Sequence, residues 1–154
     1  MLRIHADYNG LGRSENGSVA IPLDTFGSLR DLSNAGVRLR DGLPLLVVDW
    51  SDEEEDLEAE ATAQYDPGNS AWLAVLAPGG YRYVPKGDRA PDHRFLCLGC
   101  RRDLGRDPVT GEHPQAGVVF IESPHGQLCP ACGTPISAAL APPEPRAAAP
   151  RAAT

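Results

Sequence analysis

Four cysteines are the residues of this chain whose type and spacing most directly predict chemistry. They form two C-x2-C pairs with 28 residues between them, namely Cys97 with Cys100 and Cys129 with Cys132. A C-x2-C turn can aim two thiolates at one ion, and two such turns supply four soft ligands in a tetrahedral arrangement. Because four thiolates leave no open coordination position, the pattern predicts one structural Zn²⁺.

Disulfides and redox-active pairs are the alternatives for these cysteines. Disulfides occur mainly in exported proteins, and residues 1–8 lack the apolar stretch of a signal peptide. A redox C-x2-C pair normally opens a helix that follows a strand, whereas Gly133, Thr134 and Pro135 follow Cys132. Structural zinc is therefore the preferred interpretation.

The second turn, C-P-A-C-G at residues 129–133, resembles the metal-binding turn of zinc ribbons. The resemblance covers residues 93–136 and implies two such turns on adjacent β-hairpins, with a strand expected at 117–123. The first turn departs from the family pattern, since Leu98 stands where proline is common and Arg101 where the glycine would be. These two departures from the family pattern leave all four cysteines in place.

A weak internal repeat surrounds the two turns. The pattern H-x2-L-C-x2-C begins once at His93 and again at His125, as expected for two pseudo-symmetric turns that face one ion. The histidines could instead bind a second metal, but four thiolates already fill the coordination of a zinc ion. We interpret them as residues at the surface or around the ligands.

Short strands separated by turns dominate the first half. Alternation and apolar runs predict strands at 2–8, 18–23, 43–50, 71–76 and 81–84, and a short helical turn at 29–35 that ends at Gly36. Residues 57–65 alternate strictly, although their alanines and glutamates also favour a helix. The turn residues 66–70 favour a hairpin.

The order of these strands resembles the SH3-like barrels, including the Tudor and KOW groups, in residues 42–50, 59–61 and 72–75. The resemblance implies a binding module. The expected fold is therefore mainly β, with a small SH3-like β-barrel at 1–85, a linker at 86–92, a zinc ribbon at 93–137 and a disordered Ala/Pro-rich tail at 138–154. A change in charge supports the boundary, because residues 1–90 carry 8 basic and 15 acidic residues and residues 91–154 carry 6 of each.

Three groups of residues are candidate binding surfaces. Trp50 and Trp72 could form an aromatic pocket for a cationic ligand, although packing of a small core is the alternative. The acidic run 52–56 could dock a basic partner or be a solvated loop. Arginines around the first turn could contact phosphates or a protein: Arg94, Arg101, Arg102 and Arg106.

Composition limits the function classes. The net charge of −7 argues against a protein that coats nucleic acid, and the longest apolar run, 43–48, is far too short to cross a membrane. Arginine exceeds lysine 13 to 1, which suggests a GC-rich bacterial genome. No motif of a known catalytic or nucleotide-binding site occurs.

We expect a cytoplasmic, non-catalytic zinc-binding adaptor or regulatory protein that recognises another protein. The alternative is a nucleic-acid-associated zinc-ribbon factor, and an enzyme with an unrecognised site is a third hypothesis. No membrane partner is expected.

Overall fold

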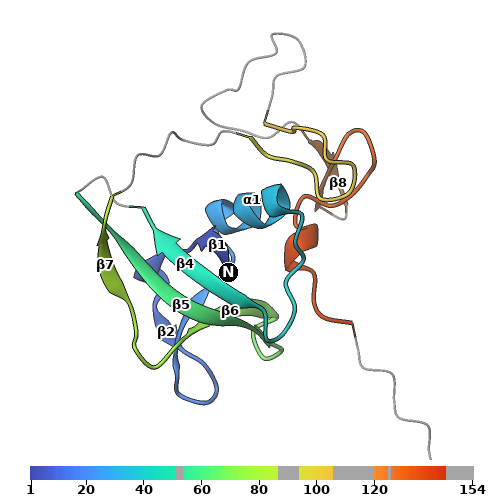
Figure 1. Ribbon diagram of the computed structural model, residues 1–154. Helices are drawn as coiled ribbons and strands as arrows, with labels where there is room; N and C mark the ends of the chain where they lie inside the picture. The colour runs from blue at the N-terminus through green and yellow to red at the C-terminus, as the bar shows by residue number, and fades with distance from the viewer. Residues whose placement is uncertain (51–53, 87–93, 106–119, 125, 145–154) are drawn as a thin grey trace, which may run out of the picture.

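The computed structural model describes residues 1–50, 54–86, 94–105, 120–124 and 126–144, and within them it is mainly β (Figure 1). The elements in chain order are β1 (Leu2–His5), η1 (Tyr8–Gly10), β2 (Gly12–Arg13), β3 (Val19–Pro22), α1 (Phe26–Ala35), β4 (Pro44–Asp49), β5 (Glu55–Asp66), β6 (Ala71–Leu76), β7 (Arg82–Pro85), β8 (Ile121–Ser123), β9 (Gly126–Leu128) and η2 (Ala138–Leu140).

Seven strands form one mixed sheet in the order β1-β4-β5-β6-β3-β2, and β7 also pairs with β5. The sheet is not closed into a barrel, so the expected barrel is corrected while the mainly β class is confirmed. The reason is the pairing of β1, which runs parallel to β4 and lies at one end of the order, while β2 lies at the other end. These two end strands do not pair with each other among the described residues.

The long strand β5 connects the two parts of this sheet. Its first residues pair with β7, and its last six pair with β6 in antiparallel register from Ala61 opposite Leu76 to Asp66 opposite Ala71. The strand and hairpin predicted for 57–76 are therefore confirmed. Small buried residues on alternate positions, Ala59, Ala61 and Ala63, explain why the segment forms a strand despite its helical composition, because burial of one face outweighs local propensity.

Helix α1 lies against one face of the sheet (Figure 1). Its N-cap is Thr25, whose side chain accepts a hydrogen bond from the N–H of Ser28. At the other end Gly36 has a φ of 70°, and the N–H groups of Gly36 and Val37 bond to the carbonyls of Ser33 and Leu32 in a Schellman motif. Gly36 thus ends the helix as predicted. No helix among the described residues is long and apolar enough to cross a membrane.

The buried core extends from the sheet into the cysteine-containing segments. Phe95, Cys97, Leu104 and Cys129 belong to the same cluster of buried residues as Ile4 on β1 and Leu32 on α1. The division at 86–92 falls largely outside the described residues and stays a prediction. The two parts that it separates share one apolar core.

The beginning of the expected tail differs from the prediction. Residues 138–140 form η2, in which Ala138 and Ala139 are buried. The carbonyl of Ala139 accepts a hydrogen bond from the N–H of Leu39, and that of Ala141 accepts one from the indole N–H of Trp72. Alanine is small enough to pack in this narrow contact, which composition alone did not reveal. Residues 145–154 lie outside the described part of the chain.

Candidate metal centre

The four cysteine sulfurs converge at one point of the structure. All four Sγ atoms lie within 4.8 Å of one another. The Sγ of Cys97 is 3.6 Å from that of Cys132, and the Sγ of Cys100 is 3.7 Å from that of Cys129. Four sulfurs bound at 2.3 Å to one tetrahedral ion would be separated by about 3.8 Å. The cluster is therefore able to hold a metal ion.

The two C-x2-C turns have the same backbone hydrogen bonds. In the first turn, the N–H of Arg101 donates to the carbonyl of Cys97 at 2.9 Å, and the N–H of Cys97 donates to the carbonyl of Arg102 at 2.8 Å. In the second turn, Gly133 donates to Cys129 at 2.9 Å and Cys129 to Thr134 at 2.8 Å. We call these turns the first knuckle (97–102) and the second knuckle (129–134).

The neighbouring backbone extends this equivalence. Single β-bridges join Leu96 to Asp103 and Leu128 to Pro135, one on each knuckle. The hairpin of β8 and β9 leads directly into the second knuckle, and β8 forms the last three residues of the strand expected at 117–123, of which 117–119 lie outside the described residues. The repeat found in the sequence thus corresponds to two equivalent backbone turns that face one another. His93 and His125 lie outside the described residues.

Arg101 anchors the first knuckle to helix α1. Its guanidinium donates to the carbonyls of Ser33 and Asn34, at 2.7 Å from Nη1 and 2.7 Å from Nη2. The last carbonyls of a helix carry partial negative charge, and that of Ser33 accepts from Arg101 in addition to the N–H of Gly36. Arg101 was predicted as part of a binding surface, but its guanidinium binds within the protein.

Asn34 provides a second connection between α1 and the first knuckle. Its side-chain oxygen accepts a hydrogen bond from the N–H of Leu96 at 2.7 Å, and its side-chain nitrogen donates to the carbonyl of Arg94 at 3.0 Å. The amide thus pairs with the backbone leading into Cys97 as a neighbouring strand would. The sequence had no signal for this role, because an asparagine near a helix end is common.

The two knuckles also contact one another around Thr134. A Cβ placed on Gly99 would collide with the hydroxyl of Thr134 and would lie 3.3 Å from the Sγ of Cys132. The Thr134 hydroxyl lies 3.1 Å from that sulfur, where it can donate a hydrogen bond to the thiolate. Gly99 therefore allows the first knuckle to approach the second.

The four thiols differ in burial, and the pKa values of Cys97 and Cys132 are shifted. Cys97 and Cys129 are buried, whereas Cys100 and Cys132 are exposed. Burial raises the pKa of the Cys97 thiol to about 11. The Thr134 hydroxyl lowers the pKa of the Cys132 thiol to about 6, because it stabilises the thiolate. A bound cation would favour the thiolate form of every ligand.

The arrangement of the sulfurs favours a bound ion over the two alternatives for the cysteines. All four are free, and the separations of 3.6 and 3.7 Å far exceed the S–S bond of a disulfide, about 2.0 Å. Those close approaches join sulfurs of different knuckles, as convergence on one ion requires, while the sulfurs of each C-x2-C pair also lie within 4.8 Å of each other.

The two tryptophans do not form a common pocket. Trp72 is buried on β6, and its ring meets that of Tyr65 edge-on at 5.2 Å. Trp50 follows β4 and lies beneath the guanidinium of Arg3, 5.3 Å from the ring centre. Trp72 lies opposite Tyr65 on β5. Asp49, the residue before Trp50, lies opposite Leu57 on the same strand. Because Leu57 and Tyr65 are separated by roughly 25 Å of extended strand, the two tryptophans lie far apart.

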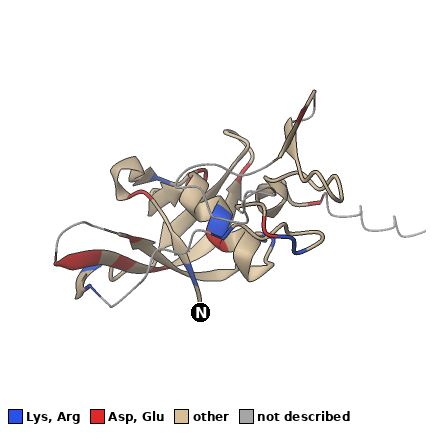
Figure 2. Ribbon diagram, turned by 90° about the horizontal axis from the view of Figure 1, so that it is seen from above, with Lys and Arg blue, Asp and Glu red and all other residues tan. Residues whose placement is uncertain are grey.

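The remaining candidate residues differ in their surroundings. Arg94 and Arg102 are exposed on the first knuckle and its approach, and Arg106 lies outside the described residues. In the acidic run, Asp52 and Glu53 are also outside them, while Glu55 and Asp56 begin β5 and the latter is buried. Figure 2 shows acidic residues along this part of β5 with basic residues beside them. The run is therefore partly strand rather than wholly a solvated loop.

Comparison with family models, with curated protein sequences and with solved structures found no match for this chain. The site is therefore interpreted from its own geometry. It is a four-sulfur centre held by two facing knuckles and joined to α1 by Arg101 and Asn34.

Proposed function

We propose that this protein is a non-catalytic zinc-binding adaptor or regulatory protein that recognises another protein. The observation that carries the proposal is the convergence of four sulfurs within 4.8 Å from two equivalent knuckles. Four thiolates complete a tetrahedral shell and leave no position at the ion for water or substrate. The ion would hold the fold together rather than perform a reaction.

Zinc is the proposed ion because it favours tetrahedral thiolate coordination, and cytoplasmic zinc proteins commonly use such cysteine sets. Binding would release whatever protons the thiols still carry. Burial raises the pKa of the Cys97 thiol, so this cysteine would hold its proton more tightly without the ion than an ordinary thiol does. The proposal places the protein in the cytoplasm, where reducing conditions keep thiols available as ligands.

The surroundings of the arginines near the first knuckle favour recognition of a protein over recognition of nucleic acid. Arg101 donates to the carbonyls of α1, so within the predicted arginine cluster Arg94 and Arg102 are the described members whose guanidiniums do not bond to the helix end. The chain has a net charge of −7, which opposes non-specific attraction to phosphates.

Affinity capture followed by reconstitution tests the proposal. The zinc-loaded protein is expected to form a stoichiometric complex with one purified protein and to give no gel shift with DNA or RNA at low salt. A salt-sensitive shift with nucleic acid, without a stoichiometric protein complex, would contradict the proposal and favour the nucleic-acid-associated factor.

A further inference from the structure

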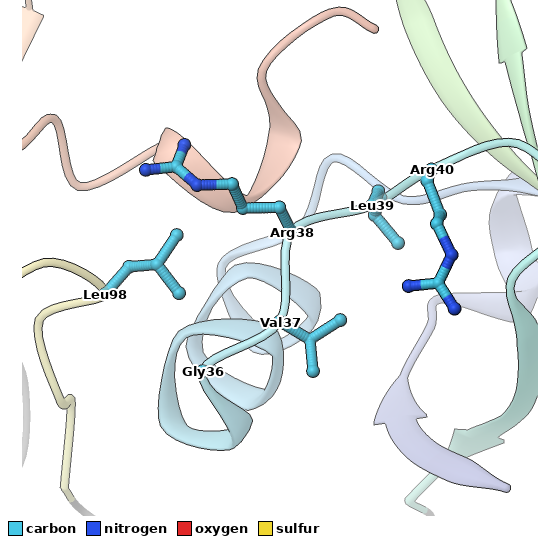
Figure 3. Close-up of a pocket in the computed structure, with 6 residues that line it drawn as sticks. All are labelled: Gly36, Val37, Arg38, Leu39, Arg40 and Leu98. Carbon is cyan, nitrogen blue, oxygen red and sulfur yellow. The ribbon is translucent and has the colours of Figure 1, made fainter.

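A groove lies where the segment that follows α1 meets the first knuckle (Figure 3). It has a volume of about 510 Å³ and is lined by Gly36, Val37, Arg38, Leu39, Arg40 and Leu98. In Figure 3, Leu98 reaches from the knuckle toward this segment, Arg38 extends over the Leu98 side, and Arg40 extends to the other side. The lining of the groove therefore combines apolar side chains with two guanidiniums, which in this view lie on opposite sides of the segment 36–40.

No carboxylate of the described residues pairs with either of these two arginines, Arg38 and Arg40. Arg38 donates from Nη1 to the carbonyl of Ala138 at 3.2 Å, which is an uncharged acceptor. The nearest carboxylate in sequence, Asp41, accepts a hydrogen bond from the backbone N–H of Tyr65.

The apolar part of the lining comes from both sides of the junction. Leu39 is buried and belongs to the core, whereas Val37 and Leu98 are half-buried and pack against it. An aliphatic side chain placed here would extend a core that already exists. The two guanidiniums would meet anionic groups on either side of that side chain.

We propose that this groove docks an acidic segment of a protein partner, in which an aliphatic side chain lies between carboxylates. Charge complementarity is the argument for this occupant, because a guanidinium binds a carboxylate through two parallel hydrogen bonds. The apolar part of the lining favours a peptide over a nucleic-acid backbone, which would present phosphates without an aliphatic side chain. The inference rests on the proposed function and deepens it.

The groove also depends on the metal centre. Leu98 lies between the ligand Cys97 and Gly99, so one wall of the groove is part of the first knuckle. The other wall, residues 36–40, begins at the helix end that receives Arg101. Removal of the ion is therefore expected to separate the two walls and abolish docking.

Fluorescence anisotropy with a defined probe tests the inference on the full-length, zinc-loaded protein. The probe is a short fluorescein-labelled peptide in which glutamate and leucine alternate, and the comparison peptide has glutamine in place of glutamate. We expect saturable binding of the acidic probe and at least tenfold weaker binding of the glutamine peptide. Equal binding of both peptides, or no binding of the acidic probe, would overturn the inference.

Arg40→Glu is the decisive variant, since its side chain has no ion pair within the described residues and its loss should not unfold the protein. Arg13→Glu is the matched control, because it makes the same charge change at an exposed position on β2. We expect about tenfold weaker binding for Arg40→Glu and less than a twofold change for Arg13→Glu. Equal effects of the two variants would show a general charge effect and overturn the assigned groove.

A second comparison separates this inference from the proposed function. The protein partner found by reconstitution is titrated against wild-type protein and against Leu98→Asp, with zinc content measured in both. If zinc content is unchanged and the affinity falls at least tenfold, the groove is supported. If the partner binds both equally well, the groove is overturned while the adaptor function stands.

Discussion

Arg101 and Gly133 occupy the same position in the two knuckles, and both have a positive φ, 66° and 74° respectively. Glycine adopts this conformation without steric cost, whereas a residue with a Cβ does not. The arginine is strained at this position, but its side chain reaches the carbonyls of Ser33 and Asn34. The first knuckle thus has an arginine where glycine would be unstrained, and this arginine connects the knuckle to α1.

Two substitutions of Arg101 measure separately the cost of its positive φ and the contribution of its hydrogen bonds to α1. Arg101→Ala keeps the positive φ and loses both hydrogen bonds, so it should lower the free energy of unfolding by about 2 kcal/mol. Arg101→Gly also loses the bonds but relieves the strain, and should recover about 1 kcal/mol of that loss. Urea unfolding at a fixed concentration of free zinc measures both values.

The control for these variants is Arg102→Ala, at the neighbouring exposed position. Its effect should be within about 0.5 kcal/mol, as is usual for surface substitutions. If Arg101→Ala were as stable as Arg102→Ala, the attachment to α1 would contribute nothing measurable.

Contact between the knuckles makes Gly99 and Thr134 energetically coupled. Gly99→Ala places a methyl group against the Thr134 hydroxyl and should cost about 2 kcal/mol, a typical penalty for overpacking. Thr134→Ala removes that hydroxyl, so the double variant should recover part of the loss. A double-mutant cycle on unfolding free energies should give a coupling of about 1 kcal/mol.

Gly79→Ala is the control, because a Cβ at Gly79 meets nothing within 4 Å. It should leave the free energy of unfolding nearly unchanged. Additive effects of Gly99→Ala and Thr134→Ala would mean that the knuckles are not in contact at this point.

Alkaline pH should destabilise the protein through Tyr8. Its hydroxyl donates to the carbonyl of Val47 at 2.9 Å, and burial, aided by the charges of Asp49 and Glu58, raises its pKa well above the ordinary 10.0. Because the folded state holds this proton more tightly than the unfolded state, the stabilisation is complete below pH 10 and is lost as the pH rises above it.

Stability curves of wild-type protein and Tyr8→Phe test this linkage. The wild-type curve should fall more steeply with pH above about 10. Absorbance titration of tyrosine should show one late ionisation that the variant lacks. Parallel stability curves for the two proteins would contradict the raised pKa.

The sequence predicted the local elements and the convergence of the four cysteines better than the arrangement of the sheet. Alternation in 57–65 and the glycine at 36 are local signals, and β5 and the end of α1 followed from them. The parallel pairing of β1 with β4 joins residues more than 40 positions apart, such as Leu2 and Leu45. No local pattern encodes such a pairing, and this is why an open sheet was mistaken for a barrel.

The candidate site was predictable to a similar extent. The cysteine spacing predicted that these four side chains would converge, and their sulfurs do lie within 4.8 Å of one another. The roles of Asn34 and Arg101 depend on where α1 ends relative to the first knuckle. That relationship is tertiary, so the sequence suggested a surface role for Arg101 instead.

Metal content measured together with thiol accessibility tests the central claim most directly. Protein purified under reducing conditions should contain about one zinc per chain, and a thiol reagent should modify its four cysteines only after a chelator is added. Four freely reactive thiols in folded, metal-free protein would contradict the account.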